Sequence, residues 1–314
     1  MNVYSHRHYE SDDRLYEQFE EETGIRVNVV TASADELITR LEREGEASPA
    51  DVLITVDAGR LHRARSRDLL QPVVSEVLEA NVPSHLRDRE GMWYGLTRRA
   101  RVIAYHRERV DSSALSTYEA LADPEWEGRV LIRSSSNVYN QSLLASLIAH
   151  LGPEAARNWA AGVVSNMARE PSGGDTDQLK AVAGGVGDVA VVNTYYLARL
   201  HGSEDEEERR VAEVLGVHFP NQDGRGAHVN VSGAGVTRHA RNPENAVRLL
   251  EFLTSDAAQQ VYAEANGEYP VKEGVAWSPV LESWGQFNTD ELDLSELGEL
   301  NDEAVRIFDE VGWQ

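Results

Sequence analysis

The sequence predicts an α/β protein made of two interleaved lobes. Its 314 residues exceed the length over which a single hydrophobic core usually keeps growing. Apolar runs of strand length alternate with segments of helical periodicity, which is the pattern of α/β folds. We find no internal repeat and no low-complexity linker in the sequence. Two crossings between interleaved lobes therefore fit the pattern better than two domains in a row.

The first lobe is expected to begin with a βαβαβ series. Its first helix should stop at Gly24, because glycine is a strong signal for a helix end. The expected elements are, in order, a strand within residues 2–9 that ends in a polar cluster, a helix at 12–23, a strand at 25–30, a helix at 35–44, a strand at 51–56, and helical segments at 58–66 and 73–78.

A second alternating series follows an expected hinge near residues 97–101. Its elements are a strand at 101–105, a short helix at 118–121, a strand at 130–133, a polar turn at 134–137, helices at 141–151 and 155–167, a Gly-rich turn at 172–177 that caps a helix at 178–183, and a buried strand from Val189 that ends near Tyr195 and Tyr196.

The chain then returns to the first lobe. A charged run at 202–210 is expected to be solvated. The remaining elements are a strand at 229–236, helices at 243–253 and 257–266, an acidic helix near 290–300 and a last helix at 302–311. We assign residues 1–98 plus 229–268 to an N-terminal lobe and 99–228 plus 269–314 to a C-terminal lobe.

The composition limits the classes of partner and of metal site that the protein can have. A formal net charge of −23, from 53 acidic and 30 basic residues, disfavours nucleic acid and anionic membranes as partners. It also favours solubility at high salt, so we expect a halophilic origin. No apolar run reaches the 18 residues of a membrane span, and no export signal follows Met1. Cysteine is absent, so a metal site must use oxygen and nitrogen ligands.

Five residues are candidates for such a site: His8, Tyr9, Tyr139, Tyr195 and Tyr196. They lie where predicted loops or strand ends would face a cleft, the usual ligand position in α/β sheets. A hard trivalent ion prefers anionic oxygen donors, and a cation stabilises a phenolate. Four phenolates would exceed a ferric charge by one. Spacing alone does not establish that these residues converge, and taken alone the tyrosine pair suits packing or a hydrogen bond.

Two further features leave alternatives open. Asp57 follows a predicted strand. Its preferred interpretation is a helix cap, and the alternatives are a metal ligand or an acceptor that hydrogen-bonds to the ligands. Arg98, Arg99 and Arg101 form a basic island that either offsets phenolate charge or makes surface ion pairs. Enzyme signatures are thin, because the sequence has no GxSxG, Walker A, HExxH or dinucleotide motif. We therefore expect a binding protein and no enzyme.

Several motifs resemble the periplasmic ferric-ion-binding proteins of bacterial iron ABC transporters, which have the type II periplasmic binding fold. In that fold each lobe is a mixed sheet flanked by helices, and two strands form the hinge. The resemblance covers nearly the whole chain in order. Its motifs are YSHRHY at 4–9, ITVDAGRL at 54–61, RARVIAY at 99–105, SSSNVYNQS at 134–142, GGDTDQLKAVAGGVGDVAVVNTYYLARL at 173–200 and EYPV at 268–271.

The resemblance implies a ligand set. The iron ligands of that family fall on His8, Tyr9, Tyr139, Tyr195 and Tyr196. One branch lacks a tyrosine at the position of Tyr139 and completes the iron shell with a phosphate or carbonate anion, water and a carboxylate near Asp57. This chain resembles the other branch, typified by cyanobacterial proteins, in which side chains suffice. Arg101 is then expected to support the ligands without touching iron.

The implied function is capture of ferric iron in a cleft between the lobes and delivery to a membrane permease. The protein would be a periplasmic monomer whose signal sequence is absent from this chain, with ferric iron as its transported ligand. Closure of two lobes on the ion would favour the bound state. Two alternatives stay open: the same fold binding a small organic solute or anion, with Arg101 as the anion clamp, and an enzyme that uses tyrosinate-bound iron.

Overall fold

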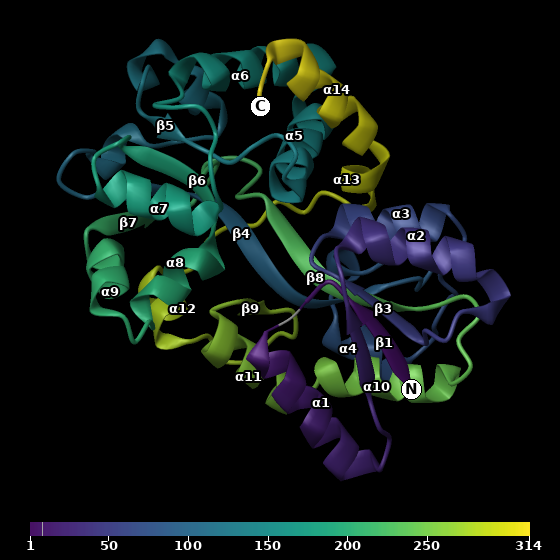
Figure 1. Ribbon diagram of the computed structural model, residues 1–314. Coiled ribbons are helices and arrows are strands. Elements are labelled where there is room, and N and C mark those ends of the chain that lie inside the picture. The colour runs from purple at the N-terminus through teal and green to yellow at the C-terminus, as the bar shows by residue number, and fades with distance from the viewer. Residues whose placement is uncertain (8) are drawn as a thin grey trace. The chain divides into compact units, whose positions relative to one another are not determined.

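The computed structural model describes residues 1–7 and 9–314, so the predicted ligand His8 lies outside the described residues. The chain forms two compact units (Figure 1). Unit 1 comprises Met1–Arg98, Asn230–Ser278 and Asp293–Gly298, and unit 2 comprises Arg99–Val229, Pro279–Leu292 and Glu299–Gln314. In the described part of the chain, no helix is long and apolar enough to cross a bilayer.

The sheet of unit 1 contains the predicted βαβαβ start. Its first strand pairs in parallel with the two strands that follow it in sequence, and the third pairs antiparallel with a late strand. All four residues of the third strand are buried, which explains its unbroken apolar sequence. These strands are β1 (Asn2–Ser5), β2 (Asn28–Thr31), β3 (Val52–Thr55) and β8 (Val229–Val236).

Helices cover this sheet, and local signals set their ends. The first helix stops at Gly24, which adopts a φ of 70° as the predicted end requires. The second begins at Ser33, whose hydroxyl accepts a hydrogen bond from the Glu36 backbone. The helices are α1 (Glu10–Thr23), α2 (Ala34–Glu44), α3 (Ala58–Ser66), α4 (Glu76–Asn81), α10 (Pro243–Leu253), α11 (Asp256–Asn266) and the short α13 (Ser295–Glu299).

The sheet of unit 2 is built on the second half of a long strand, β4 (Tyr94–His106). β6 (Val189–Asn193) and β7 (Leu215–His218) pair antiparallel with β4, and β5 (Val130–Leu131) pairs in parallel with β6. A buried apolar cluster around Val102, Val192 and Leu197 forms the core here. The helices are α5 (Val138–Leu151), α6 (Pro153–Asn166), α7 (Asp175–Ala183), α8 (Thr194–His201), α9 (Glu206–Glu213), α12 (Pro279–Ser283) and α14 (Asn301–Val311).

The structure corrects several predicted boundaries. β4 has thirteen residues, where we expected only 101–105. β2 and α4 start three residues later than expected, and residues 119–122 form a 3₁₀ turn in place of a helix. α5 begins at Val138, so Tyr139 lies inside the helix and not in the turn before it. The cause is Asn137, whose side chain accepts a hydrogen bond from the Tyr139 backbone and caps the helix.

The C-terminal tail contributes to both units. Residues 269–278 pack in unit 1, whereas we expected 269–314 in the second lobe. The reason is β9 (Tyr269–Pro270), which pairs with β4 at Arg98 and Thr97. The boundaries of the lobes that would move during binding stay a prediction.

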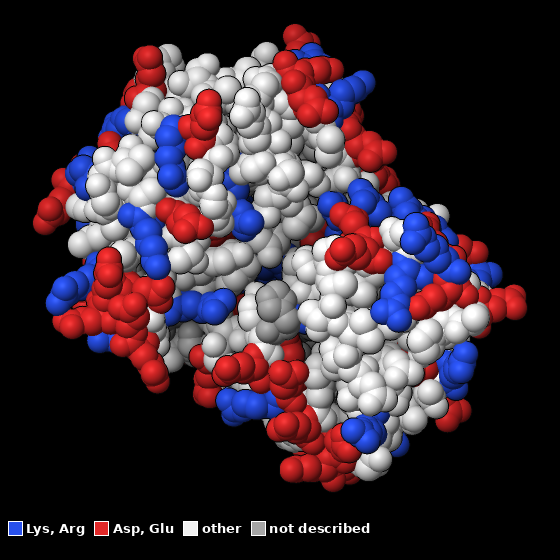
Figure 2. All heavy atoms as spheres, in the orientation of Figure 1, with Lys and Arg blue, Asp and Glu red and all other residues white. Residues whose placement is uncertain are grey.

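Acidic side chains are prominent on the surface. On the face drawn in Figure 2 they gather over α1 and over α9. The first turn of α9 alone carries Glu206, Glu207 and Glu208. This helix overlaps the charged run at 202–210 that the sequence predicted to be solvated, and six of the nine residues of that run are exposed.

Candidate metal centre

The tyrosine pair lies directly beyond a buried strand. All five residues of β6 are buried, and α8 begins at the next residue, so Tyr195 and Tyr196 fall in the first turn of that helix. Tyr195 is 3% exposed, and its ring stacks on that of Tyr196 with a centroid distance of 4.2 Å. The position at the carboxyl end of a strand agrees with the expectation from the sequence.

Tyr139 brings a third phenol to the same point. It lies in the first turn of α5, and its hydroxyl is 3.1 Å from the hydroxyl of Tyr195. Adjacent oxygen ligands of a small octahedral cation, each about 2.1 Å from the ion, would be about 3.0 Å apart. The two hydroxyls therefore have the spacing of neighbouring ligands of one ion.

Positive charge surrounds the ring of Tyr139. The guanidinium carbons of Arg99, Arg101 and Arg133 lie 5.4, 5.9 and 5.7 Å from its centroid. Arg99 and Arg101 are each 2% exposed, so the alternative of surface ion pairs is wrong for them. Three cations near one phenol offset the negative charge that phenolate ligands would bring.

Arg101 connects the segments that carry the tyrosines. Its guanidinium donates to Asp175 at 2.7 Å, to the side chain of Asn193 at 3.2 Å and to that of Asn140 at 2.7 Å. Asn140 follows Tyr139, and Asn193 lies two residues before Tyr195. The starts of α5 and α8 are thus held by one buried cation.

Asp175 supports the candidate site, although its position in the sequence did not indicate this. It is fully buried, and besides Arg101 it accepts a hydrogen bond of 2.8 Å from the backbone of Asn193. Arg133 lies 3.6 Å from its other oxygen. Burial is the largest single influence on Arg133 and lowers its pKa, but Asp175, Tyr196 and Tyr139 together outweigh it, so that the pKa of Arg133 is raised. In the sequence, Asp175 belongs to a Gly-rich turn that looked only like a helix cap.

Unit 1 contributes Tyr9, which immediately precedes α1. Its backbone N–H donates to Asp12 at 3.3 Å, and the guanidinium of Arg7 lies 5.0 Å from the centre of its ring. Tyr9 is half-buried. The segment that carries Tyr9 is therefore fixed by charged neighbours within unit 1.

Asp57 is a helix cap, the first of its three predicted roles. One carboxylate oxygen accepts a hydrogen bond of 3.2 Å from the backbone of Arg60 at the start of α3. The other accepts one of 2.7 Å from the side chain of Asn230. The side chain is fully buried.

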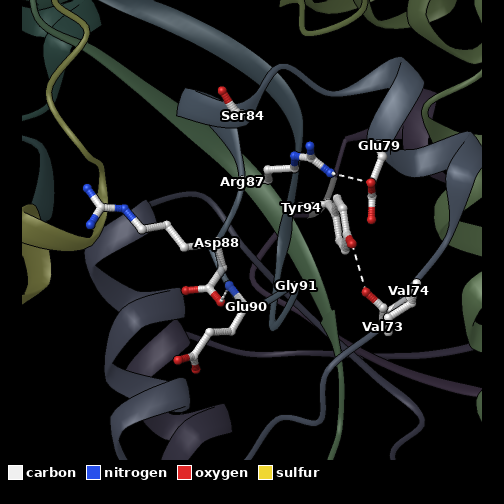
Figure 3. A pocket seen from close by; sticks show the side chains of 10 residues that line it. Val73, Val74, Glu79, Ser84, Arg87, Asp88, Glu90, Gly91 and Tyr94 are labelled. Carbon is white, nitrogen blue, oxygen red and sulfur yellow. Dashed lines mark hydrogen bonds and ion pairs between the residues drawn. The ribbon is translucent and has the colours of Figure 1, made fainter.

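Other candidate sites are weaker. Among the described residues, no group of three or more His, Cys, Asp or Glu side chains is placed to hold a metal ion. A pocket in unit 1 is lined by Val73, Glu79, Arg87 and Tyr94, among others (Figure 3). The Tyr94 hydroxyl donates to the Val73 carbonyl at 2.8 Å, and Arg87 lies 3.9 Å from Glu79. These polar groups are engaged with one another, and none of the predicted ligands lines this pocket.

The chain belongs to the family of bacterial extracellular solute-binding proteins, which residues 47–289 match. Over 314 residues it is 53% identical to iron uptake protein A1 of Synechocystis sp., covering the whole chain and 87% of that protein. Major ferric iron-binding protein of Neisseria meningitidis serogroup B is 26% identical over 320 residues, covering 99% of the chain and 92% of that protein.

Solved structures agree with this assignment. The Trichodesmium protein IdiA or FutA, in complex with iron and citrate, superposes with a TM-score of 0.97 at 50% identity, covering the whole chain and 99% of that structure. The ferric binding protein of Campylobacter jejuni gives a TM-score of 0.96 at 42% identity over the full length of both. The predicted fold class and the predicted resemblance to ferric-binding proteins are confirmed. The names of these relatives describe iron uptake and iron binding.

Proposed function

We propose that this protein is a periplasmic receptor that captures ferric iron and delivers it to the permease of an ABC transporter. The observation that carries the proposal is the approach of the Tyr139 and Tyr195 hydroxyls to 3.1 Å, with Tyr196 stacked beside Tyr195. Phenolate oxygens suit a hard trivalent ion. The iron-related names of relatives with up to 53% identity support the same ligand.

The proposed ligands are His8, Tyr9, Tyr139, Tyr195 and Tyr196. The last three belong to unit 2, and Tyr9 belongs to unit 1. A set drawn from both units makes the closed arrangement the tighter binder, so iron shifts the population toward closure. Arg101 supports the phenols without touching the ion. Protein side chains fill the shell, and no outside anion is required.

The delivery step completes the proposal. The receptor acts as a monomer in the periplasm, and its partner is the membrane permease of an iron transporter, with no role for nucleic acid. It is a carrier and not an enzyme, because five protein ligands leave little room for a substrate on the metal.

The alternative of an organic solute or anion clamped by Arg101 has less support. The guanidinium of Arg101 is buried and already donates to Asp175, Asn193 and Asn140. The charge of Arg101 is already balanced by its buried ion pair with Asp175, so a free anion would have to be desolvated to reach a cation that has a carboxylate partner.

Calorimetric titration tests the proposal. Iron-free protein is titrated with ferric citrate in a buffer without phosphate or carbonate, and separately with phosphate, sugars and polyamines. We expect one tightly bound ferric ion per chain and no comparable heat from the other solutes. Tight binding of an organic solute, or ferric binding that requires added phosphate, would contradict it.

A further inference from the structure

Arg7 is a buried cation of unit 1 with several bonded partners. It is 2% exposed, and its guanidinium reaches two carboxylates and two hydroxyls. The distances from its nitrogens are 3.1 Å to Asp12, 3.2 and 3.0 Å to the two oxygens of Glu268, 3.2 Å to Thr97 and 2.8 Å to Ser232. The forked geometry of arginine allows such a set of bonds from one side chain.

The two hydroxyls belong to the two strands by which the chain passes between the units. Thr97 lies on β4 one residue before Arg98, the last residue of unit 1 on that strand. Ser232 lies on β8 two residues after Asn230, where the chain re-enters unit 1. Arg7 is therefore bonded to both crossing strands at their unit 1 ends.

The same cluster also contacts Tyr9, one of the proposed ligands. Arg7 directly precedes His8 and Tyr9 in sequence, and its guanidinium lies 5.0 Å from the ring centre of Tyr9. Asp12 accepts hydrogen bonds both from Arg7 and from the Tyr9 backbone. A displacement of Tyr9 thus acts on a rigid charged cluster that includes both strands.

The bonds of Arg7 are of two kinds, ion pairs within unit 1 and contacts to the two crossing strands. The ion pairs with Asp12 and Glu268 already compensate the buried charge of Arg7. The bonds to Thr97 and Ser232 add contacts to two strands that are distant in sequence, with separations of 90 and 225 residues from Arg7.

We propose that Arg7 is a positioning residue that couples metal capture by Tyr9 to the two crossing strands. The inference rests on the proposed function, since it takes Tyr9 as an iron ligand. Iron bound by Tyr9 favours one arrangement of the cluster, and the cluster favours one orientation of the strands. By reciprocity, the strands that allow closure also tighten the hold on iron.

The test removes the strand contacts of Arg7, together with the hydrogen bond of 2.9 Å from Thr97 to Glu268, and keeps both carboxylate partners of Arg7. The double variant Thr97→Val plus Ser232→Ala is compared with a matched control, Thr254→Val plus Ser48→Ala. Thr254 and Ser48 are buried hydroxyl residues of unit 1 that donate to Leu250 and Glu44, and neither lies on a crossing strand. Three quantities are measured: the visible spectrum of the ferric form, the rate of iron release to excess chelator, and the compaction on iron binding by small-angle X-ray scattering.

For Thr97→Val plus Ser232→Ala we expect an unchanged phenolate-to-iron band, because the ligands remain. Iron release should be about three- to tenfold faster than in wild type, in line with the loss of one or two buried hydrogen bonds, and compaction should be smaller. The control should match wild type in all three measurements. Lys at position 7 keeps the charge but not the forked bonds, so Arg7→Lys should shift release in the same direction.

Wild-type release and compaction in the double variant would overturn the inference. A control that releases iron as fast as the double variant would also overturn it, because the effect would then be general destabilisation. Loss of the phenolate-to-iron band in Thr97→Val plus Ser232→Ala, but not in the control, would mean that these hydroxyls affect the iron ligands directly. This result would also overturn the inference. Absence of the band in wild type would instead overturn the proposed function, and the inference with it.

Discussion

Tyr139 decides how the proposed iron shell is completed. Its hydroxyl lies 3.1 Å from that of Tyr195, at the spacing of neighbouring ligands. Without this phenol an outside anion would have to fill the position. Three guanidinium groups lie near its ring and would balance the negative charge of the phenolates.

Replacement of Tyr139 by Phe should weaken ferric binding and make it depend on an added anion. The ring and its packing remain, but one anionic donor is lost, so we expect at least about a tenfold loss of affinity, on the scale seen when the support of a metal site is removed. Competition with a chelator, with and without phosphate, measures the effect. Tyr105→Phe, a half-buried tyrosine on β4, is the control. Equal affinity of Tyr139→Phe and wild type would remove Tyr139 from the ligand set.

Asp175→Asn should destabilise the iron-free protein. The change removes the carboxylate from a fully buried pair with Arg101 and leaves that cation uncompensated. Breaking a buried pair from one side costs about 3 kcal/mol or more. Denaturant unfolding measures the loss, with Asp177→Asn as the control, since Asp177 lies in the same helix turn but is exposed. A loss below about 1 kcal/mol, the range of exposed ion pairs, would refute the role of Asp175.

The first turns of α5 and α8 bring the phenols of the candidate site together. Each helix begins with its tyrosines in the first turn, and each start is bonded to Arg101 through a neighbouring asparagine. The geometry of the site therefore depends on where these helices begin.

Asn137→Ala should loosen the start of α5. The side chain of Asn137 caps the helix through the backbone N–H of Tyr139, and loss of such a cap costs about 1 kcal/mol. Asn137→Asp keeps an acceptor and should stay near wild type. Unfolding free energies of the two variants give the comparison. Equal stabilities of the alanine and aspartate variants would show that the cap contributes nothing.

Hydrophobic periodicity predicted the helices and strands whose own sequences have a regular apolar pattern. α3, α10 and β8 have the predicted boundaries. β7 and β9 were not predicted, because they are short. Their pairing with β4 defines them, rather than an alternation of apolar and polar residues in their sequences. The first half of β4 was also missed, since Gly95 interrupts its apolar pattern.

The site was partly visible in the sequence. The place of Tyr195 and Tyr196 after a buried strand followed from the apolar run before them. The partners of Arg101 did not, because burial of an aspartate in a Gly-rich acidic turn depends on the tertiary fold alone. The ligand set itself, including His8, stays a proposal that only a metal-bound state can test.

The whole molecule combines an acidic surface with buried basic groups. The formal net charge is −23, yet Arg7, Arg99 and Arg101 are each 2% exposed. Exposed acidic charge favours solubility, while the buried arginines serve the two halves of the proposed site. The halophilic origin inferred from this composition stays a prediction.

Mild acid should destabilise the iron-free protein, in part through His228. Burial, followed by nearby Arg101 and Arg99, lowers the pKa of His228 to about 3. In the unfolded chain the pKa is about 6.5, so between these values the unfolded state binds a proton that the folded state does not. The contribution of His228 is therefore complete above about pH 6.5 and declines as the pH falls, by about 2 kcal/mol from pH 7 to pH 5.

His228→Gln checks this sign and size. The variant removes the titrating group, so its unfolding free energy should fall less than that of wild type over the same pH interval. Denaturant midpoints at pH 7 and pH 5 provide both values. An identical decrease in the two proteins would contradict the assignment of this acid sensitivity to His228.

The central claim is that iron is held by phenolates, and the visible spectrum of the ferric-loaded protein tests it most directly. We expect a phenolate-to-iron charge-transfer band that colours the protein, and loss or a clear shift of this band in Tyr195→Phe plus Tyr196→Phe. Tyr105→Phe should leave the band as it is. A colourless protein after ferric loading, or a band unchanged in the double tyrosine variant, would contradict the account.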